Sequence, residues 1–295
     1  MLPALKSGDY IGVMAPSSYV EKDDIERSIA FIEQRGYHAF IHPQTYERHH
    51  QSAGTSAQKI EALHDLYARD DIRAVWAAGG GNRALSLLDH INFDALKAAS
   101  KPMIGFSDVT ALLNGIYAHT GAQSVHGPVF SKLYKHKQAD ELFKMLGGEH
   151  VAIPLGKAHI INDGDAHAAI IGGNLSVFQY LPQTLPNNFC DGAIIFLEDC
   201  SEELSRIDRM LYHLKQLGVF DRARGLVFGQ FTDMKESGRP FGFSFEDIIR
   251  EHTQGLDIPI VMNAPFGHGD DLHPIAVGSH MRLNTAERAL EPQNF

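Results

Sequence analysis

The sequence predicts a two-domain α/β protein, with a parallel-sheet domain first and a smaller mixed α/β domain after it. Its 295 residues are more than one typical domain needs and enough for two. Apolar strand-like runs alternate with amphipathic helix-like segments through the first 128 residues, which is typical of a parallel sheet covered on both faces. The alternation then pauses in a stretch rich in Gly, Asp and Ala. We therefore expect domains at 1–150 and 171–295, joined by a linker at 151–170.

The N-terminal elements follow from apolar periodicity and stop signals. Ile25, Ile29 and Ile32 share one helical face ahead of Gly36, and Thr55 caps a second helix, unless Ser56 does so. The predicted strands, the first and third running into loops, are 10–18, 37–43, 72–81, 101–106 and 122–128. The predicted helices are 22–36, 55–70, 82–91 and 108–121. Ligands of such sheets bind at the carboxyl ends of the strands.

The C-terminal half mixes strands and helices. Its strongest helix is 201–218, where four apolar residues make one face and Gly218 ends it; they are Leu204, Ile207, Leu211 and Leu214. Further predicted elements are strands at 192–199 and 223–231, a helix at 244–255, and a strand running into a loop at 258–269. Short strands are expected within 150–174.

Composition narrows the class of partner. The formal net charge is −10 and the basic residues form no dense run, which argues against nucleic acid or an anionic membrane. The two cysteines, Cys190 and Cys200, give neither a disulfide framework nor a metal-binding pair. The N-terminus has a polar segment where a signal peptide is apolar, and no apolar run approaches ~18 residues. These features predict a cytoplasmic protein.

Gly79, Gly80 and Gly81 follow a predicted strand and precede a predicted helix. Such a loop either presents N–H groups to an anion or forms a tight turn with positive φ. The surrounding residues form no dinucleotide fingerprint, and no lysine completes a phosphate-binding loop.

Ser107 stands at another strand-to-helix turn, in "GFSDVT". A serine there is commonly a helix cap. Gly105 also matches the first half of the nucleophile-elbow pattern, although Val109 replaces its second glycine. The N–H of Asp108, at the helix start, would then supply half of an oxyanion hole. The local pattern leaves both readings open.

Polar residues stand at or just after the ends of two predicted strands in the second half of the chain. Glu198 and Asp199 end a buried strand, and His268 lies between two glycines after "APF". Each has a structural explanation, as a loop cap or a buried histidine. A metal site is an alternative. Its ligands would be His268, Asp270, Asp271 and His273, with the segment 163–167 as a second group.

Several motifs together resemble a known family. "IGFSDVTAL", "GGNLS", "IIFLEDCSEELSRIDRMLYHL" and "PFGHG" stand in the order and approximate spacing of the LD-carboxypeptidases. These serine peptidases include murein tetrapeptide carboxypeptidases and microcin C immunity peptidases. The similarity runs from "GVMAPSS" to "HPIAVGSHMRLN". It implies a flavodoxin-like or class I glutaminase-like N-terminal domain and a mixed C-terminal domain.

The resemblance also implies site residues. The family's Ser–His–Glu triad falls on Ser107, His268 and Glu198, and its oxyanion hole on the N–H groups of Asp108 and Gly80. Ser107 needs a base within hydrogen-bond reach, which His268 would supply, with Glu198 fixing the tautomer. We therefore expect Ser107 and His268 to face each other across a domain cleft, Glu198 to lie behind the histidine, and Ser107 to have an unfavourable backbone conformation.

The glycine loop departs from one branch of the family. Murein-type members commonly carry "RGGYG" where this chain has "AGGGN", so Ala78 replaces the arginine and Gly81 the tyrosine. Microcin-immunity members tend to have Asn near the position of Asn82. Arg83 either replaces the missing cation or is a solvated first-turn residue. We expect Gly79, Gly81, Asn82 and Arg83 to contact substrate.

The sequence therefore predicts a cytoplasmic serine carboxypeptidase, without metal or other cofactor, that removes the terminal D-alanine of murein tetrapeptide. We expect a homodimer whose partner is a murein or related small peptide, and neither nucleic acid nor membrane. The alternatives are hydrolysis of a peptidyl or aminoacyl nucleotide, as in microcin C immunity, a metal-dependent hydrolase, and a ligand-binding protein in which Ser107 is only a cap.

Overall fold

A computed structural model describes residues 2–236 and 238–293 as two compact units. Among these residues, the first unit comprises 2–151 and 273–278, and the second comprises 152–236, 238–272 and 279–293. The sequence-based division differs in two places. Residues 273–278 belong to the first unit, and the expected linker at 151–170 contains strands of the second.

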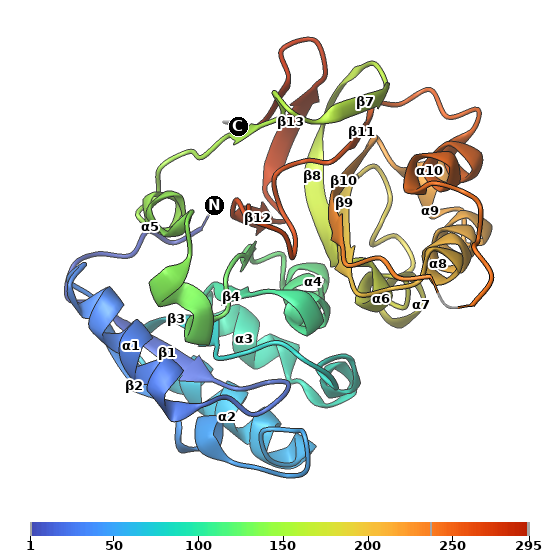
Figure 1. The fold of residues 1–295 in the computed structure, drawn as a ribbon. Coiled ribbons are helices and arrows are strands. Elements are labelled where there is room, and N and C mark those ends of the chain that lie inside the picture. The colour runs from blue at the N-terminus through green and yellow to red at the C-terminus, as the bar shows by residue number, and fades with distance from the viewer. Residues whose placement is uncertain (1, 237, 294–295) are drawn as a thin grey trace. The chain divides into compact units, whose positions relative to one another are not determined.

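The first unit is built on a six-stranded sheet with the strand order β12-β5-β4-β3-β1-β2 (Figure 1). Five strands are parallel, in the flavodoxin-like order 2-1-3-4-5, and β12 runs antiparallel to β5. The strands are β1 (Tyr10–Met14), β2 (His38–Ile41), β3 (Ile72–Ala77), β4 (Met103–Gly105), β5 (Ser124–His126) and β12 (Ile275–Val277). The helices are α1 (Lys22–Glu33), α2 (Ser56–Ala68), α3 (Phe93–Ala99), α4 (Thr110–Thr120) and α5 (Ala139–Leu146).

Alternation along β1 places helices on both faces of this sheet. Ile11 and Val13 join a buried cluster with Ile25 and Ile32 of α1. Gly12 faces the other way, where an added Cβ would lie 2.8 Å from a methyl of Leu66 in α2. Successive strand residues point to opposite faces, so both faces are buried.

One predicted helix is of another type, and several short helices, α5 among them, were not predicted. The predicted helix at 82–91 is a 3₁₀ helix, η2 (Leu85–His90), and α3 was not predicted. The second predicted helix is capped by Thr55, which shares a reciprocal capping box with Gln58.

The second unit contains an eight-stranded mixed sheet with the order β6-β14-β13-β8-β9-β10-β11-β7. The central strands β8 to β11 are parallel, and the flanking pairs are antiparallel. The strands are β6 (Ile153–Pro154), β7 (His159–Asn162), β8 (Asp165–Asn174), β9 (Ile194–Cys200), β10 (Gly225–Thr232), β11 (Ile260–Met262), β13 (His280–Asn284) and β14 (Ala289–Pro292). The helices are α6 (Leu175–Phe178), α7 (Leu181–Thr184), α8 (Leu204–Gln216), α9 (Val219–Arg222) and α10 (Phe245–Thr253), and α8 contacts both α9 and α10.

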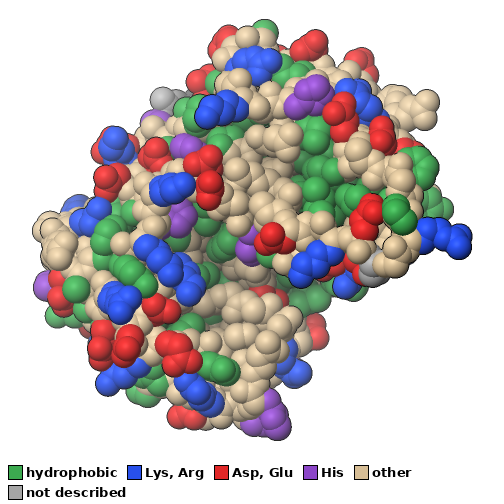
Figure 2. All heavy atoms as spheres, viewed as in Figure 1, with side chains coloured by type: hydrophobic (Ala, Val, Ile, Leu, Met, Phe, Trp, Pro, Cys, Tyr) green, Lys and Arg blue, Asp and Glu red, His purple; other side chains and the backbone are tan. Residues whose placement is uncertain are grey.

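Positively and negatively charged side chains are mixed on the face of the molecule that Figure 2 draws. Over the first unit, Lys and Arg side chains are interspersed with Asp and Glu (Figure 2). Among the described residues, no helix combines the length and the apolar character that crossing a bilayer requires.

Candidate active site

Ser107 lies at the turn between β4 and α4 with a positive φ of 62°. This confirms the predicted strain, because a non-glycine residue in the left-handed region is uncommon and costs energy. Gly105 makes room for the turn, since a Cβ there would lie 2.5 Å from Val109 Cγ1. Val109 thus packs over Gly105 at the position of the elbow's second glycine.

Ser107 does not cap the helix that follows it. The N–H of Thr110 donates to the backbone oxygens of Ser107 and Asp108, and the start of α4 has no side-chain cap. Within its own unit and among the described residues, the Ser107 hydroxyl has no hydrogen-bond partner. The hydroxyl is therefore not used for capping.

The glycine loop lies against this serine. A Cβ on Gly80 would be 3.1 Å from Ser107 Cβ and 3.4 Å from its Oγ, so a side chain at this position would crowd the serine. The carbonyl of Gly80 accepts a 3.1 Å hydrogen bond from the N–H of Ser18. Gly81 has φ 126° and packs on the Ser18 side chain, whereas Gly79 packs on Val20. The loop is thus held beside the turn that carries Ser107.

Asp108 anchors the turn through its side chain. It is buried, and its Oδ2 accepts hydrogen bonds from Ser17 Oγ at 2.5 Å and from the N–H of Ala84 at 2.9 Å. Burial raises the pKa of Asp108, while those hydrogen bonds and the charge of Lys59 act to lower it. The carboxylate thereby ties "APSS" and the segment after the glycine loop to the residue that follows Ser107.

Lys59 is a buried cation that the sequence analysis did not identify. Its Nζ donates to the Ser17 carbonyl at 2.8 Å and to Ser52 Oγ at 2.5 Å. Burial lowers the pKa of Lys59 to about 8, against the opposing effect of the Asp108 charge. A lysine on the helix α2 reads in sequence as solvated, so only the three-dimensional contacts reveal it.

Glu198 and His268 meet in the second unit. Glu198, at the end of β9, is fully buried, and its Oε2 lies 2.6 Å from His268 Nδ1. The loop that carries His268 depends on Gly267, which has φ 127° and approaches Glu198 and the Gln230 carbonyl closely. The N–H of Gln230 donates to the Phe266 carbonyl at 2.7 Å and fixes this loop to β10. The expected Glu198–His268 contact is present.

The pair is electrostatically coupled. Burial acts to lower the pKa of His268, but contacts with the Cys200 side chain and with Glu198 raise it to about 10. Burial raises the pKa of Glu198, while the histidine acts to lower it. A buried carboxylate stabilises an imidazolium and orients the ring with Nε2 available for proton transfer. Cys200 was not predicted as a neighbour, although it follows Glu198 by two strand positions.

Asp199, next to Glu198, has a structural role. Its Oδ2 accepts from the N–H of Ser176 at 2.8 Å and from the Ser176 hydroxyl at 2.6 Å, at the start of α6. Its Oδ1 accepts from Asn174 at 3.0 Å. The two carboxylates of "LED" therefore have different partners: Glu198 contacts His268, and Asp199 holds the start of α6.

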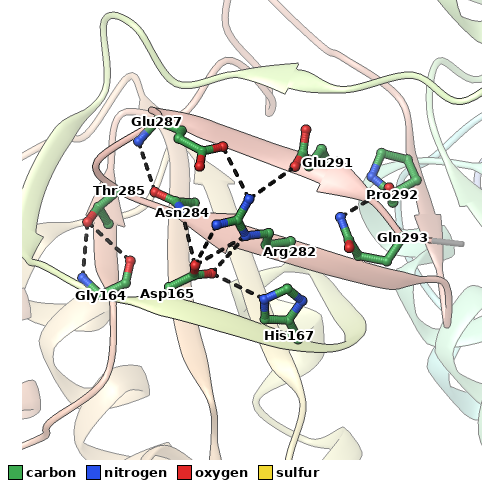
Figure 3. Close-up of polar contacts among 10 residues, drawn as sticks. All are labelled: Gly164, Asp165, His167, Arg282, Asn284, Thr285, Glu287, Glu291, Pro292 and Gln293. Atoms are coloured by element: carbon green, nitrogen blue, oxygen red, sulfur yellow. Dashed lines mark hydrogen bonds and ion pairs between the residues drawn. The ribbon is translucent and has the colours of Figure 1, made fainter.

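The groups proposed as metal ligands lie in other arrangements. Figure 3 shows Asp165 bound to Arg282, Asn284 and His167, with Arg282 Nη2 at 2.7 Å from Asp165 Oδ2. His273 lies 3.7 Å from Glu141 in the first unit. Within residues 2–236 and 238–293, no three His, Cys, Asp or Glu side chains form a group able to hold a metal ion.

Asn82 and Arg83 are exposed beside the glycine loop. Arg83 has φ 84° and precedes η2, whose N-cap is Ala84, so it is not a first-turn residue. Its carbonyl accepts a 3.0 Å hydrogen bond from Ser86 Oγ.

A strained serine beside a glycine loop on one α/β unit, and a buried Glu–His pair on another, are the components of a serine hydrolase. Residues 11–127 match the LD-carboxypeptidase N-terminal domain and residues 167–283 the LD-carboxypeptidase C-terminal domain. The chain belongs to the LD-carboxypeptidase family and is a serine carboxypeptidase.

The similar proteins include a murein peptidase and a self-immunity protein. The chain is 30% identical to a murein tetrapeptide carboxypeptidase of Pseudomonas aeruginosa, with 88% of each chain covered. It is 25% identical to the microcin C7 self-immunity protein of Escherichia coli, covering 95% of this chain and 92% of that one. Among solved structures, muramoyltetrapeptide carboxypeptidase of Oxalobacter formigenes superposes with a TM-score of 0.86 at 26% identity, with 97% and 99% covered. The microcin protein in its wild-type apo state gives 0.90 at 22% identity, with 100% and 99% covered, which shows the shared fold.

Proposed function

We propose that this enzyme is an LD-carboxypeptidase that releases the terminal D-alanine of murein tetrapeptide in cell-wall recycling. The observation that carries the proposal is the buried Glu198–His268 pair, together with a serine held at φ 62° whose hydroxyl is not used as a cap. The 30% identical murein tetrapeptide carboxypeptidase supports the substrate class.

In the proposed mechanism, Ser107 Oγ attacks the carbonyl of the L,D bond while His268 Nε2 takes its proton. Glu198 stabilises the resulting imidazolium. The N–H groups of Asp108 and Gly80 would stabilise the oxyanion; the close packing of Gly80 on Ser107 supports this assignment. His268 then protonates the leaving amine of D-alanine, and water hydrolyses the acyl-enzyme by the reverse proton transfers. Gly79, Gly81, Asn82 and Arg83 would line the substrate site.

The test is purified enzyme with murein tetrapeptide, scored for free D-alanine and for the tripeptide. We expect both products in equal amounts, and neither from Ser107→Ala. The competing substrate is an aminoacyl or peptidyl nucleotide, suggested by the microcin self-immunity relative. Cleavage of an aminoacyl sulfamoyl adenosine without D-alanine release would reject the murein assignment in favour of that one.

We also propose that the enzyme is a cytoplasmic homodimer. Both cysteines are free, which suits a reducing compartment. Cell fractionation and light scattering test these assignments, and a monomer at micromolar concentration, or recovery outside the cytoplasm, contradicts them.

A further inference from the structure

We propose that a pocket in the first unit, formed by residues 49–52 and 54–56 with Arg83, binds a carboxylate of the peptide substrate. The pocket has a volume of about 450 Å³. This inference rests on the proposed function, which it extends by naming the site and the charged group that it takes. We call it the 49–56/Arg83 pocket.

The lining of the pocket is suited to an anion. Arg83 is exposed and, among the described residues of its unit, its guanidinium has no carboxylate partner. Two imidazoles, His49 and His50, lie 4.8 Å apart between ring centroids and add polar N–H groups. The pocket also includes Thr55 and Ser56 at the N-terminus of α2, where the helix dipole favours negative charge.

Nearby charges reinforce this preference. The charge of Arg83 contributes to the lowered pKa of Lys59, so the two cations share one neighbourhood. Arg48, which precedes the pocket residues in the chain, is paired with Glu21 at 3.1 Å. Acidic side chains are absent from the described lining residues.

Hydrogen bonds within the first unit hold the wall of the 49–56/Arg83 pocket. His49 and Ser52 exchange backbone hydrogen bonds of 2.8 and 3.0 Å, which closes the loop between them. Lys59 Nζ donates a 2.5 Å hydrogen bond to Ser52 Oγ and so holds this hydroxyl in place. Arg83 and His50 both have positive φ, at 84° and 57°, and such conformations persist where the surrounding structure determines them. A preformed site loses less entropy on binding.

Both walls are tied to the proposed nucleophile through one residue. Ala84, which follows Arg83, donates its N–H to Asp108. On the other wall, Ser52 Oγ donates to the Ser17 carbonyl at 3.3 Å, and the Ser17 hydroxyl donates to Asp108. Asp108 is adjacent to Ser107 in the chain. One hydrogen-bonded network thus joins both walls to the turn that carries Ser107, and the carboxylate that we assign to the pocket belongs to a peptide bound at that turn.

The first experiment measures steady-state kinetics on murein tetrapeptide and on versions with each carboxylate amidated in turn. Arg83→Gln is compared with Arg73→Gln, an exposed arginine of the same unit outside the pocket. We expect Arg83→Gln to raise KM about 10-fold or more with kcat changed far less, because a hydrogen bond to a charged group is lost. Amidating the recognised carboxylate should weaken the wild type similarly and have little further effect on Arg83→Gln. Equal behaviour of the two arginine variants, or additive losses, overturns the proposal.

A second experiment does not depend on murein hydrolysis. N-acetyl-D-alanine and its C-terminal amide are titrated into the intact protein, and the imidazole proton signals of His49 and His50 are followed by NMR. The signals are assigned with His49→Gln and His50→Gln. We expect the acid to shift them, the amide to leave them unchanged, and Arg83→Gln to abolish the shift. If tetrapeptide is not cleaved but this response is present, the substrate assignment fails and the pocket stands. No shift, or equal shifts with acid and amide, rejects the pocket.

Discussion

Glu198 Oε2 and His268 Nδ1 lie 2.6 Å apart although 70 residues separate them in the chain. The contact joins the end of β9 to the loop after β11, and both groups are largely shielded from water. At such a distance in a buried site, the charge on one partner strongly controls the proton on the other.

This coupling predicts the pH dependence of catalysis. The pKa of His268 is raised to about 10, and general-base catalysis needs the neutral imidazole. We therefore expect kcat/KM to rise with pH through the alkaline range, above the ordinary histidine pKa of ~6.5. Glu198→Gln removes the stabilising charge, so the pKa should fall, the acidic limb should move to lower pH, and kcat should drop.

The control for that profile is Glu246→Gln. Glu246 also pairs with a histidine, His159, at 3.2 Å in the same unit, but both side chains are exposed. Its variant should keep the wild-type profile. A Glu198→Gln profile that coincides with wild type contradicts the proposed coupling.

Substitutions at Ser107 separate chemistry from backbone strain. Ser107→Ala and Ser107→Gly should both abolish turnover, since each removes the proposed nucleophile. The glycine variant should be the more stable of the two, with a free energy of unfolding about 1–2 kcal/mol above that of the alanine variant. Glycine adopts φ 62° without the steric cost that a Cβ brings. Urea unfolding monitored by circular dichroism measures this difference. Equal stabilities would show that the turn stores no strain, and residual activity in either variant would remove Ser107 from the mechanism.

Substitution of Lys59 should affect catalysis although this residue lies outside the proposed triad. Lys59→Met removes the cation beside Asp108 and leaves the buried Ser17 carbonyl with one donor fewer. We expect a loss of about 1–3 kcal/mol in stability and a lower kcat, because the segment that holds Asp108 loosens.

Lys101→Met provides the matched control. Lys101 is also buried and donates to backbone carbonyls, among them Tyr67 at 2.8 Å, but it does not contact Ser17 or Ser52. It should cost similar stability and leave kcat nearly unchanged. If both variants lower kcat equally, the effect of Lys59 is only structural.

Gly267 tests the loop that carries His268. Gly267→Ala meets both a positive φ of 127° and the Gln230 carbonyl, which would lie 2.8 Å from the new Cβ. We expect a lower melting temperature and a large loss of kcat, because His268 is displaced from Glu198. Gly255→Ala shares the positive φ, at 86°, without any atom within 4 Å. It should cost stability only, so an equal loss of activity in the two variants contradicts this account.

The sequence by itself determined the repeating pattern of the fold and the positions where side chains emerge from it. Short apolar runs identified the strands, apolar spacing of 3.6 residues identified the longer helices, and Ser107, Glu198 and His268 were located at strand ends. These signals are local, since one buried face is recorded in a few consecutive residues. The shortest elements were not predicted correctly for the same reason, because a few residues carry too little of the pattern. α3 spans only seven residues, and the apolar spacing of 82–91 did not distinguish an α-helix from the 3₁₀ helix η2.

Only the tertiary structure decided which distant groups meet. It returns β12, at 275–277, to the first unit as an antiparallel edge strand, because strand order follows from packing and not from chain order. It buries Lys59 in a site where backbone and hydroxyl oxygens satisfy the cation, against the usual exposure of lysine. It also buries Asp108 and Asp199, which accept hydrogen bonds from protein groups where a solvated loop carboxylate would bind water. Such contacts depend on long-range geometry that no local pattern in the sequence records.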